Sequence, residues 1–219
     1  MMRRAFSSFA LVAACAVSSP AFAATTIDFE ATSQGPKAEG FSATGAPQLT
    51  FRSASGSGLE VGNFTPQTAG NGLAVFPDTG NYLIGSFATT VDFMSLMFGN
   101  DDPCCSQPGD RALLKLFLGS NLVGSNFVGL NRNDILDQSV SFGLIGGGLL
   151  FDRFEFSYAN ASGAPINLIE TVDNITFNTA ISAVPEPATW MMMLLGFGSI
   201  GFAIRRRKVA INTVSHNLA

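Results

Sequence analysis

The stretch FDRFEFSY, residues 151–158, decides the fold of this chain. Its side chains alternate in character, with Phe154, Phe156 and Tyr158 on one side and Arg153, Glu155 and Ser157 on the other. A repeat of two residues is the period of a β-strand that buries one face. We therefore expect a strand here that turns aromatic rings into a core.

Comparable patterns occur on both sides of this stretch. TVDNITFN (171–178) points Asp173, Ile175 and Phe177 one way, while VDFMSLMF (91–98) and ALLKLFLG (112–119) are apolar enough for central strands buried on both faces. Turn residues separate the strands, and no amphipathic helix of useful length occurs between residues 24 and 180; the turns lie at 77–80, 119–121 and 146–148. About ten short strands predict an all-β domain, a jelly-roll-like β-sandwich with a phenylalanine core.

Charge is distributed unevenly along the 219 residues. Residues 24–184 contain six basic and fifteen acidic side chains, whereas both ends of the chain are basic. An acidic body repels phosphate backbones, which argues against nucleic acid as a partner. The apolar residues that raise the hydrophobic content to 47% gather at the two ends, and the length allows one domain besides targeting segments.

Residues 1–23 have the layout of a secretory signal peptide. Two arginines precede an apolar run that is too short to span a bilayer stably, and Ala21 and Ala23 are the small residues expected before the cleaved bond. We therefore expect signal peptidase to cut between Ala23 and Ala24, leaving residues 24–180 as the exported domain. The alternative is a lipoprotein signal ending at Cys15, which a lipid on that cysteine would establish.

The C-terminal sorting segment, residues 181–208, combines an extended motif, an apolar run and a basic block. Pro185, Glu186 and Pro187 should be extended and open to a processing enzyme, because proline fixes φ and lacks an N–H donor. Residues 188–204 carry no charge and would measure about 25 Å as a helix, just enough for a thin bilayer. We predict a transmembrane helix there. The basic block would then hold residues 209–219 in the cytoplasm and leave the domain outside; it consists of Arg205, Arg206, Arg207 and Lys208.

Three glycines inside the apolar run, Gly196, Gly198 and Gly201, match the GxGxxG dinucleotide fingerprint. That fingerprint requires a preceding strand and an acidic residue about 20 positions later, and the sequence offers neither. The glycines are better suited to close helix packing.

Taken in order, the Pro-Glu-Pro triplet, Trp190, the run Leu194–Gly198, Gly201 and the basic block resemble the PEP-CTERM sorting signal. The resemblance implies recognition by an exosortase, a transpeptidase-like membrane protease of bacteria that export polysaccharide, with cleavage near the triplet and release or attachment at the cell surface. Members of that family usually end soon after the basic block, whereas this chain continues to Ala219. A single-span anchor that is never cut is the alternative.

The exported region retains two cysteines, Cys104 and Cys105, which are adjacent in the loop DDPCCSQPGD. Exported cysteines tend to be oxidised, and we expect either two loop thiols or a vicinal disulfide ring that stiffens a turn. Two readings stay open beside these, a redox role and a bridge to another chain.

A structural Ca²⁺ is a further expectation for this acidic domain. Residues 26–30 and 172–177 resemble the first and last strands of secreted carbohydrate-binding β-sandwiches. The resemblance would place the ion where those strands meet, with Glu30 and Asp173 as carboxylate ligands. A simpler interpretation leaves Glu30 solvated and uses Asp173 to cap a bend.

The domain offers little for catalysis. The single histidine, His216, lies beyond the predicted span, so Ser-His-Asp, Cys-His and histidine-metal sites are excluded, and we predict no enzyme and no certain cofactor. A two-carboxylate glycosidase is a formal alternative. We expect a structural protein of the cell surface or of an exopolysaccharide biofilm matrix. The alternative is a lectin-like module, for which Tyr82 and Tyr158 are the only tyrosines available to stack on a sugar.

Overall fold

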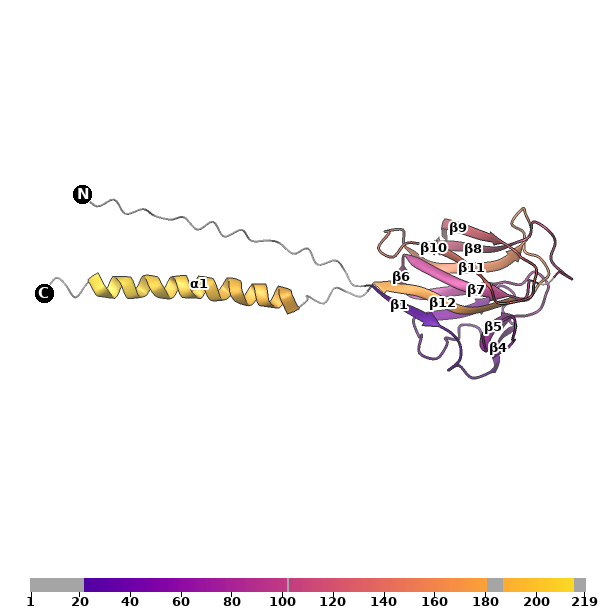
Figure 1. Ribbon diagram of the computed structural model, residues 1–219, viewed down its shortest axis with the longest axis horizontal. Coiled ribbons are helices and arrows are strands. Elements are labelled where there is room, and N and C mark those ends of the chain that lie inside the picture. The colour runs from indigo at the N-terminus through magenta and orange to yellow at the C-terminus, as the bar shows by residue number, and fades with distance from the viewer. Residues whose placement is uncertain (1–21, 102, 181–186, 215–219) are drawn as a thin grey trace. The chain divides into compact units, whose positions relative to one another are not determined.

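The computed structural model describes residues 22–101, 103–180 and 187–214 (Figure 1). These residues fall into two units, a β domain, Phe22–Ala180, and a C-terminal helix, α1 (Pro187–Val214). Most of the signal peptide, Cys15, Pro185, Glu186 and the last five residues lie outside the described residues, and so do the predictions made for them.

The β domain consists of two antiparallel sheets. The seven-stranded sheet contains β1 (Phe22–Ile27), β2 (Gly35–Lys37), β4 (Leu59–Asn63), β5 (Asn71–Val75), β7 (Phe93–Gly99), β10 (Gln138–Gly143) and β12 (Glu170–Ala180). The five-stranded sheet contains β3 (Leu49–Ser53), β6 (Leu83–Val91), β8 (Arg111–Leu118), β9 (Asn121–Gly129) and β11 (Phe151–Ala159).

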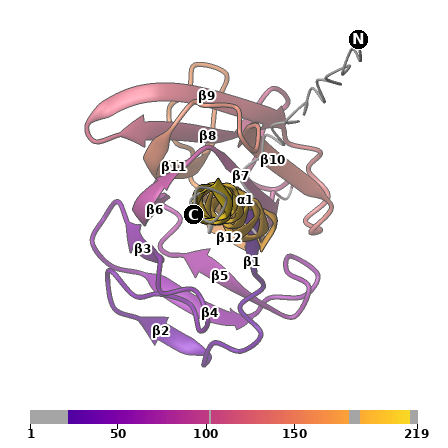
Figure 2. The same ribbon diagram turned by 90° about the vertical axis from the view of Figure 1, so that its left-hand side faces the viewer.

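Strand order shows how the chain alternates between the sheets. The seven-stranded sheet runs β10-β7-β12-β5-β4-β2, with β1 also paired to β12, and the five-stranded sheet runs β3-β6-β11-β8-β9. Figure 2 shows these two sheets facing each other. The prediction of an all-β sandwich is therefore confirmed.

Phenylalanine rings fill the space between the sheets, as predicted. Phe87 of β6 contacts Phe177 of β12 across the core, with ring centroids 5.1 Å apart, and also meets Phe151 and Phe154 of β11 at 6.0 and 5.9 Å. Such pairs add about 0.5–1.5 kcal/mol each beyond the area that they bury. The alternation in residues 154–158 accounts for the fully buried Phe154, Phe156 and Tyr158. Phe151 is out of phase with them and is buried beyond an irregularity between Phe151 and Arg153, and Ser157, which was expected on the other face, is buried as well.

Several details differ from the expectations. β7 is a central strand, but Phe93, Ser95 and Met97 are only half-buried, so the expectation of two buried faces is wrong for this strand. The described residues form twelve strands, since the short strands β2 to β5 arise in a Gly-, Ser- and Thr-rich region without clear alternation. β12 contains an irregularity between Asp173 and Thr176, where Asn174 adopts a φ of 47°.

Candidate functional site

The helix α1 carries the apolar run of the sorting segment. Its large apolar side chains are exposed, Leu194 and Phe197 each to 69%, and consecutive exposed residues from Met191 to Leu195 place apolar surface on every side of the helix. The helix does not end at the basic block but continues through it to Val214, because Arg and Lys are good helix formers. Within the described residues, no helix has the length and apolarity required to cross a membrane, so the span over 188–204 stays a prediction.

The three glycines of the apolar run lie in the middle of α1. A Cβ added at Gly196, Gly198 or Gly201 would meet nothing within 4 Å. This continuous helix is not the strand–turn–helix unit that binds a dinucleotide, which agrees with the rejection of the fingerprint.

The two predicted calcium ligands converge on one turn, residues 68–71, which leads into β5. Glu30 Oε1 accepts a hydrogen bond from the Asn71 N–H at 2.9 Å, and Asp173 Oδ2 accepts one from the Ala69 N–H at 3.0 Å. Gly70 is required beside Glu30, because an added Cβ would lie 2.0 Å from Oε1 at a φ of +105°. Both carboxylates therefore hold the turn in place.

The electrostatics of this turn bear on cation binding. Burial raises the pKa of Asp173, and the charges of Glu30 and Asp28 raise it further, while backbone hydrogen bonds oppose the shift. No cluster of three or more Asp, Glu, His or Cys side chains is arranged to hold a metal within the part of the chain that the structure describes. The calcium site thus stays a prediction, supported by the convergence of its two proposed carboxylates.

A loop clamped by a buried aspartate presents the vicinal disulfide that joins Cys104 to Cys105. Asp101 is buried and accepts hydrogen bonds from the backbone N–H groups of Arg132 at 2.7 Å and Asp134 at 3.1 Å. The Arg132 side chain in turn donates to the carbonyl of Pro103 at 3.1 Å. The two cysteines are exposed at the tip of this braced loop, which fits a stiffened turn.

Glu170 is a buried carboxyl group that the sequence analysis missed. It is 0% exposed, its Oε1 accepts a hydrogen bond from the Tyr158 N–H at 3.1 Å, and its Oε2 has no partner. Burial raises the pKa of this group well above its usual range. The acid within the apolar run Leu168–Val172 was the signal that could have identified it.

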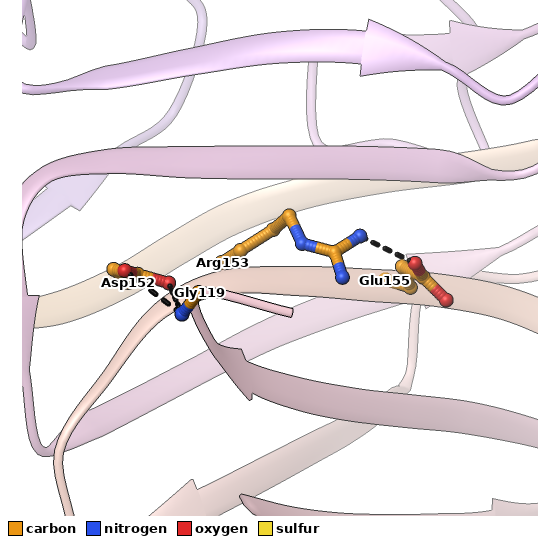
Figure 3. A network of polar contacts seen from close by, with 4 residues as sticks. All are labelled: Gly119, Asp152, Arg153 and Glu155. Carbon is orange, nitrogen blue, oxygen red and sulfur yellow. Dashed lines mark hydrogen bonds and ion pairs between the residues drawn. The ribbon is translucent and has the colours of Figure 1, made fainter. Parts of the chain in front are cut away.

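The outer face of the five-stranded sheet carries a shallow depression of about 180 Å³. It is lined by Tyr82, Lys115, Glu155, Ser157 and Pro165. Next to it, Arg153 Nη1 forms an ion pair with Glu155 Oε1 at 2.6 Å, as Figure 3 shows. The Arg153 guanidinium also lies 3.9 Å from the centre of the Phe117 ring. Burial and the charge of Glu155 raise the pKa of Tyr82.

The two tyrosines considered for sugar stacking differ in accessibility. Tyr158 is fully buried and its hydroxyl donates to the Gly99 carbonyl, so it cannot act as a binding platform. Tyr82 is half-buried at the edge of the depression. Of the two, Tyr82 alone is placed to meet a ligand.

Some solved structures overlap this chain loosely. The K2 cleaved adhesin domain of Lys-gingipain aligns at 18% identity and a TM-score of 0.41, covering 72% of this chain and 100% of that one. The xylan-binding domain from CBM 22 aligns at 15% identity and a TM-score of 0.37, covering 73% and 96%. A DUF4465 family protein from Bacteroides caccae aligns at 13% identity and a TM-score of 0.41, covering 74% and 94%. Overlaps of this quality assign no function to the domain.

Sequence comparison gives a local result. No curated protein matches the chain significantly. Residues 183–208, however, match the PEP-CTERM protein-sorting motif, which confirms the resemblance noted in the sequence. The chain therefore joins a β-sandwich domain to a PEP-CTERM protein-sorting motif at residues 183–208.

Proposed function

We propose that this protein is an exported, non-enzymatic component of the cell surface or extracellular matrix, sorted and processed by an exosortase. The observation that carries the proposal is the sorting motif at residues 183–208. The motif lies directly after the β domain, so cleavage near Pro185-Glu186-Pro187 would free the domain whole, because its last strand ends at Ala180.

The precursor is held in the membrane by residues 188–204 of α1. Their large apolar side chains are exposed around the helix, and a helix that is apolar on all sides requires a non-aqueous environment. The length of about 25 Å fits a thinned bilayer, and the basic block Arg205–Lys208 favours the cytoplasmic side. This arrangement leaves the domain outside the cell.

Replacing Pro185, Glu186 and Pro187 together with alanine tests the sorting step. The variant should accumulate as a full-length, membrane-held precursor, seen by intact-mass measurement of protein from the medium and the envelope. Ser182→Ala, a change in the same linker outside the triplet, is the matched control and should be processed normally. Appearance of the mature form at its normal size and rate in the triplet variant would show that processing does not use the motif.

The buried carboxyl group of Glu170, whose pKa is raised by burial, is not available for catalysis. Glu170 is fully buried, so it cannot reach a substrate. Deletion of the protein should reduce cell aggregation, and the purified protein should release no reducing sugar from exopolysaccharide. Release of reducing sugar would instead favour a two-carboxylate glycosidase.

Carbohydrate binding is the second candidate, and the depression around Tyr82 supports it. The ring lies beside charged and hydroxyl groups from neighbouring strands, a combination that suits a sugar. On a glycan array, Tyr82→Ala should lose any binding that the unmodified protein shows, whereas Tyr82→Phe should retain it because the ring remains. Equal binding by both variants would remove this site from consideration.

We also infer that the domain is a jelly roll with an insertion. The strands β1, β12, β7 and β10 form one layer, and β6, β11, β8 and β9 form the other, in that order. Consecutive strands of this set cross between the layers, except β8 and β9, which are neighbours in one layer, and this is the pattern of two interlocked Greek keys. The inserted strands β2 to β5 widen both sheets at one edge.

A further inference from the structure

The two ends of the β domain differ in chemistry. β12 runs from Glu170 to Ala180, and we call the end at which it finishes the exit end, because the chain leaves for the sorting segment there (Figure 1). Strand pairing brings three connections, together with the strand residues next to them, to this end: residues 88–92, 118–122 and 143–150. The opposite end, which we call the far end, contains the disulfide loop and residues 130–137.

The longest connection at the exit end, residues 143–150, exposes four large aliphatic side chains. Leu144 is exposed to 75%, and Ile145, Leu149 and Leu150 are exposed to between 43% and 50%. The hairpin residues 118–122 add Leu118 and Leu122 to the same end, also exposed. Solvated loops rarely carry so many aliphatic residues, and such a patch marks an interaction surface.

Hydrogen bonds tie this apolar loop to the strand that leads to the sorting segment. Asp92 Oδ2 accepts from the Gly146 N–H at 2.7 Å, and its other carboxylate oxygen accepts from the Asn178 side-chain amide. Asn178 lies two residues before the end of β12. The aliphatic side chains are therefore presented at a fixed place beside Ala180.

The exit end and the far end also differ in the charges on their surfaces. Residues 88–91, 118–122 and 143–150 include no charged side chain, Asp92 is buried, and the half-buried Asp152 accepts a hydrogen bond from the Gly119 N–H at 3.0 Å. The far end instead carries acidic residues on its surface, among them Asp78, Asp134 and Asp137. An anionic lipid surface repels the far end and tolerates the exit end.

The length of the linker limits where the exit end can be. Seven peptide steps separate Ala180 from Pro187, at which α1 begins, so these residues are at most about 25 Å apart. A domain whose sorting helix is held in a bilayer therefore keeps its exit end near the lipid headgroups.

We propose that the exit end docks on the lipid surface while the precursor is held in the membrane, with Leu144, Ile145, Leu149 and Leu150 inserted at the headgroup boundary. The proposal rests on the membrane-held precursor proposed above. Apolar side chains of this kind enter the interface by about 5–10 Å. Docking would hold the linker, and the Pro-Glu-Pro triplet within it, at the depth of the membrane surface.

The test uses the full chain with Cys15→Ser, in which the disulfide leaves no free thiol, and three single cysteines labelled with an environment-sensitive fluorophore. Leu149→Cys reports on the apolar loop, Ile135→Cys is a matched far-end control of similar exposure, and Leu195→Cys reports on α1. Each protein is reconstituted in phosphatidylcholine–phosphatidylglycerol vesicles with or without a nitroxide-labelled lipid. All three should keep the melting temperature of the unlabelled protein.

The nitroxide lipid should reduce the emission of the Leu149 label by about twofold or more and leave the Ile135 label unchanged. Adding Leu144→Asp and Ile145→Asp should abolish the quenching at position 149. Equal, weak quenching at 149 and 135 would overturn the docking proposal, as would a blue-shifted label at 149 that the nitroxide does not reach, which would indicate a second copy of the protein instead of lipid. The Leu195 label separates the two proposals: quenching at 195 without quenching at 149 would overturn docking alone, whereas no quenching at 195 would overturn the membrane anchor and the docking that rests on it.

Discussion

At Glu170, a carboxyl group takes the place of a missing strand. β6 pairs with β11 only as far as Phe156, so the Tyr158 N–H has no partner from that strand. Glu170 Oε1 accepts this hydrogen bond, and the Ile166 N–H donates to the Tyr158 carbonyl. One side chain thereby satisfies a buried backbone donor that would otherwise be unpaired, at the expense of burying a titratable group.

The stability of the domain should depend on the protonation of Glu170. Its pKa is raised in the folded state by burial, so its contribution is complete below the unfolded-state pKa and is lost as the pH rises through the folded-state pKa. Glu170→Gln keeps the acceptor and cannot ionise. We expect its melting temperature to exceed that of the unmodified protein near pH 8 and to equal it near pH 4, in thermal melts across about pH 4–8.

Glu170→Ala serves as the control for this prediction. It removes the acceptor and orphans the Tyr158 N–H, which should cost about 1–3 kcal/mol relative to Glu170→Gln at every pH. A Gln variant that melts below the unmodified protein near pH 8 would show that the ionised carboxylate stabilises the fold.

Calcium provides a second prediction at the scale of residues. If Ca²⁺ binds at Glu30 and Asp173 in the folded state, a hundredfold excess over its Kd should add about 2.7 kcal/mol to the free energy of unfolding. Melting curves with calcium and with chelator, on protein known to be metal-free, measure this. The gain should vanish in Glu30→Gln, and identical curves for the unmodified protein would exclude the site.

At the scale of elements, the pairing of β6 with β11 depends on one glycine. Gly85 lies opposite Phe154, and a Cβ at that position would be 2.0 Å from Cε1 of the ring. Since Phe154 is fully buried and packed against Phe87, the ring has little room to move. Gly85→Ala should therefore lower the free energy of unfolding by about 1–3 kcal/mol, measured by denaturant titration.

Gly129→Ala in β9 is the matched control. An added Cβ there meets nothing within 4 Å, so the change should alter the free energy of unfolding by less than about 0.5 kcal/mol. Equal effects of the two substitutions would show that the aromatic ring does not set the requirement for glycine at position 85.

The elements differ in how far the sequence predicted them. Residues 154–158 were predictable because alternation alone determines which face is buried, and the buried aromatic residues bear this out. In β12 the side chains Asp173, Ile175 and Phe177 were predicted to share one face, and all three are buried. The irregularity at Asn174 was not predicted, since it depends on pairing with β7 over a long sequence separation. The strands β2 to β5 lacked a local signal because their pairing is set by the sheet into which they fit.

The candidate sites also divide into those with a local sequence signal and those that depend on contacts between distant residues. The sorting motif could be predicted because its residues are consecutive and its chemistry is local. The sequence brought Glu30 and Asp173 together only through the resemblance to β-sandwiches, which predicts that the first and last strands meet. The depression around Tyr82 and the pairing of Glu170 with Tyr158 were not predicted, because each joins residues from separate strands or loops.

At the scale of the whole molecule, the basic block should determine orientation. Replacing Arg205, Arg206, Arg207 and Lys208 with glutamine removes the charge asymmetry across the proposed span, so the domain should lose its uniform outward orientation and its retention. Protease accessibility of the domain in intact cells measures this. Replacing the three arginines with lysine keeps the charge and should leave orientation unchanged; an unaltered glutamine variant would contradict the assignment.

The central position of β12 has a consequence for the timing of biogenesis. This strand pairs with β7, β5 and β1, yet it is the last part of the domain to be synthesised and to cross the membrane. Until it emerges, the seven-stranded sheet lacks its middle, and the aromatic residues that β12 covers remain without half of their packing. A chain that folds vectorially must therefore wait for its final strand, and the sorting helix follows within a few residues. We expect the protease to meet its recognition sequence at nearly the moment when the cargo completes its fold.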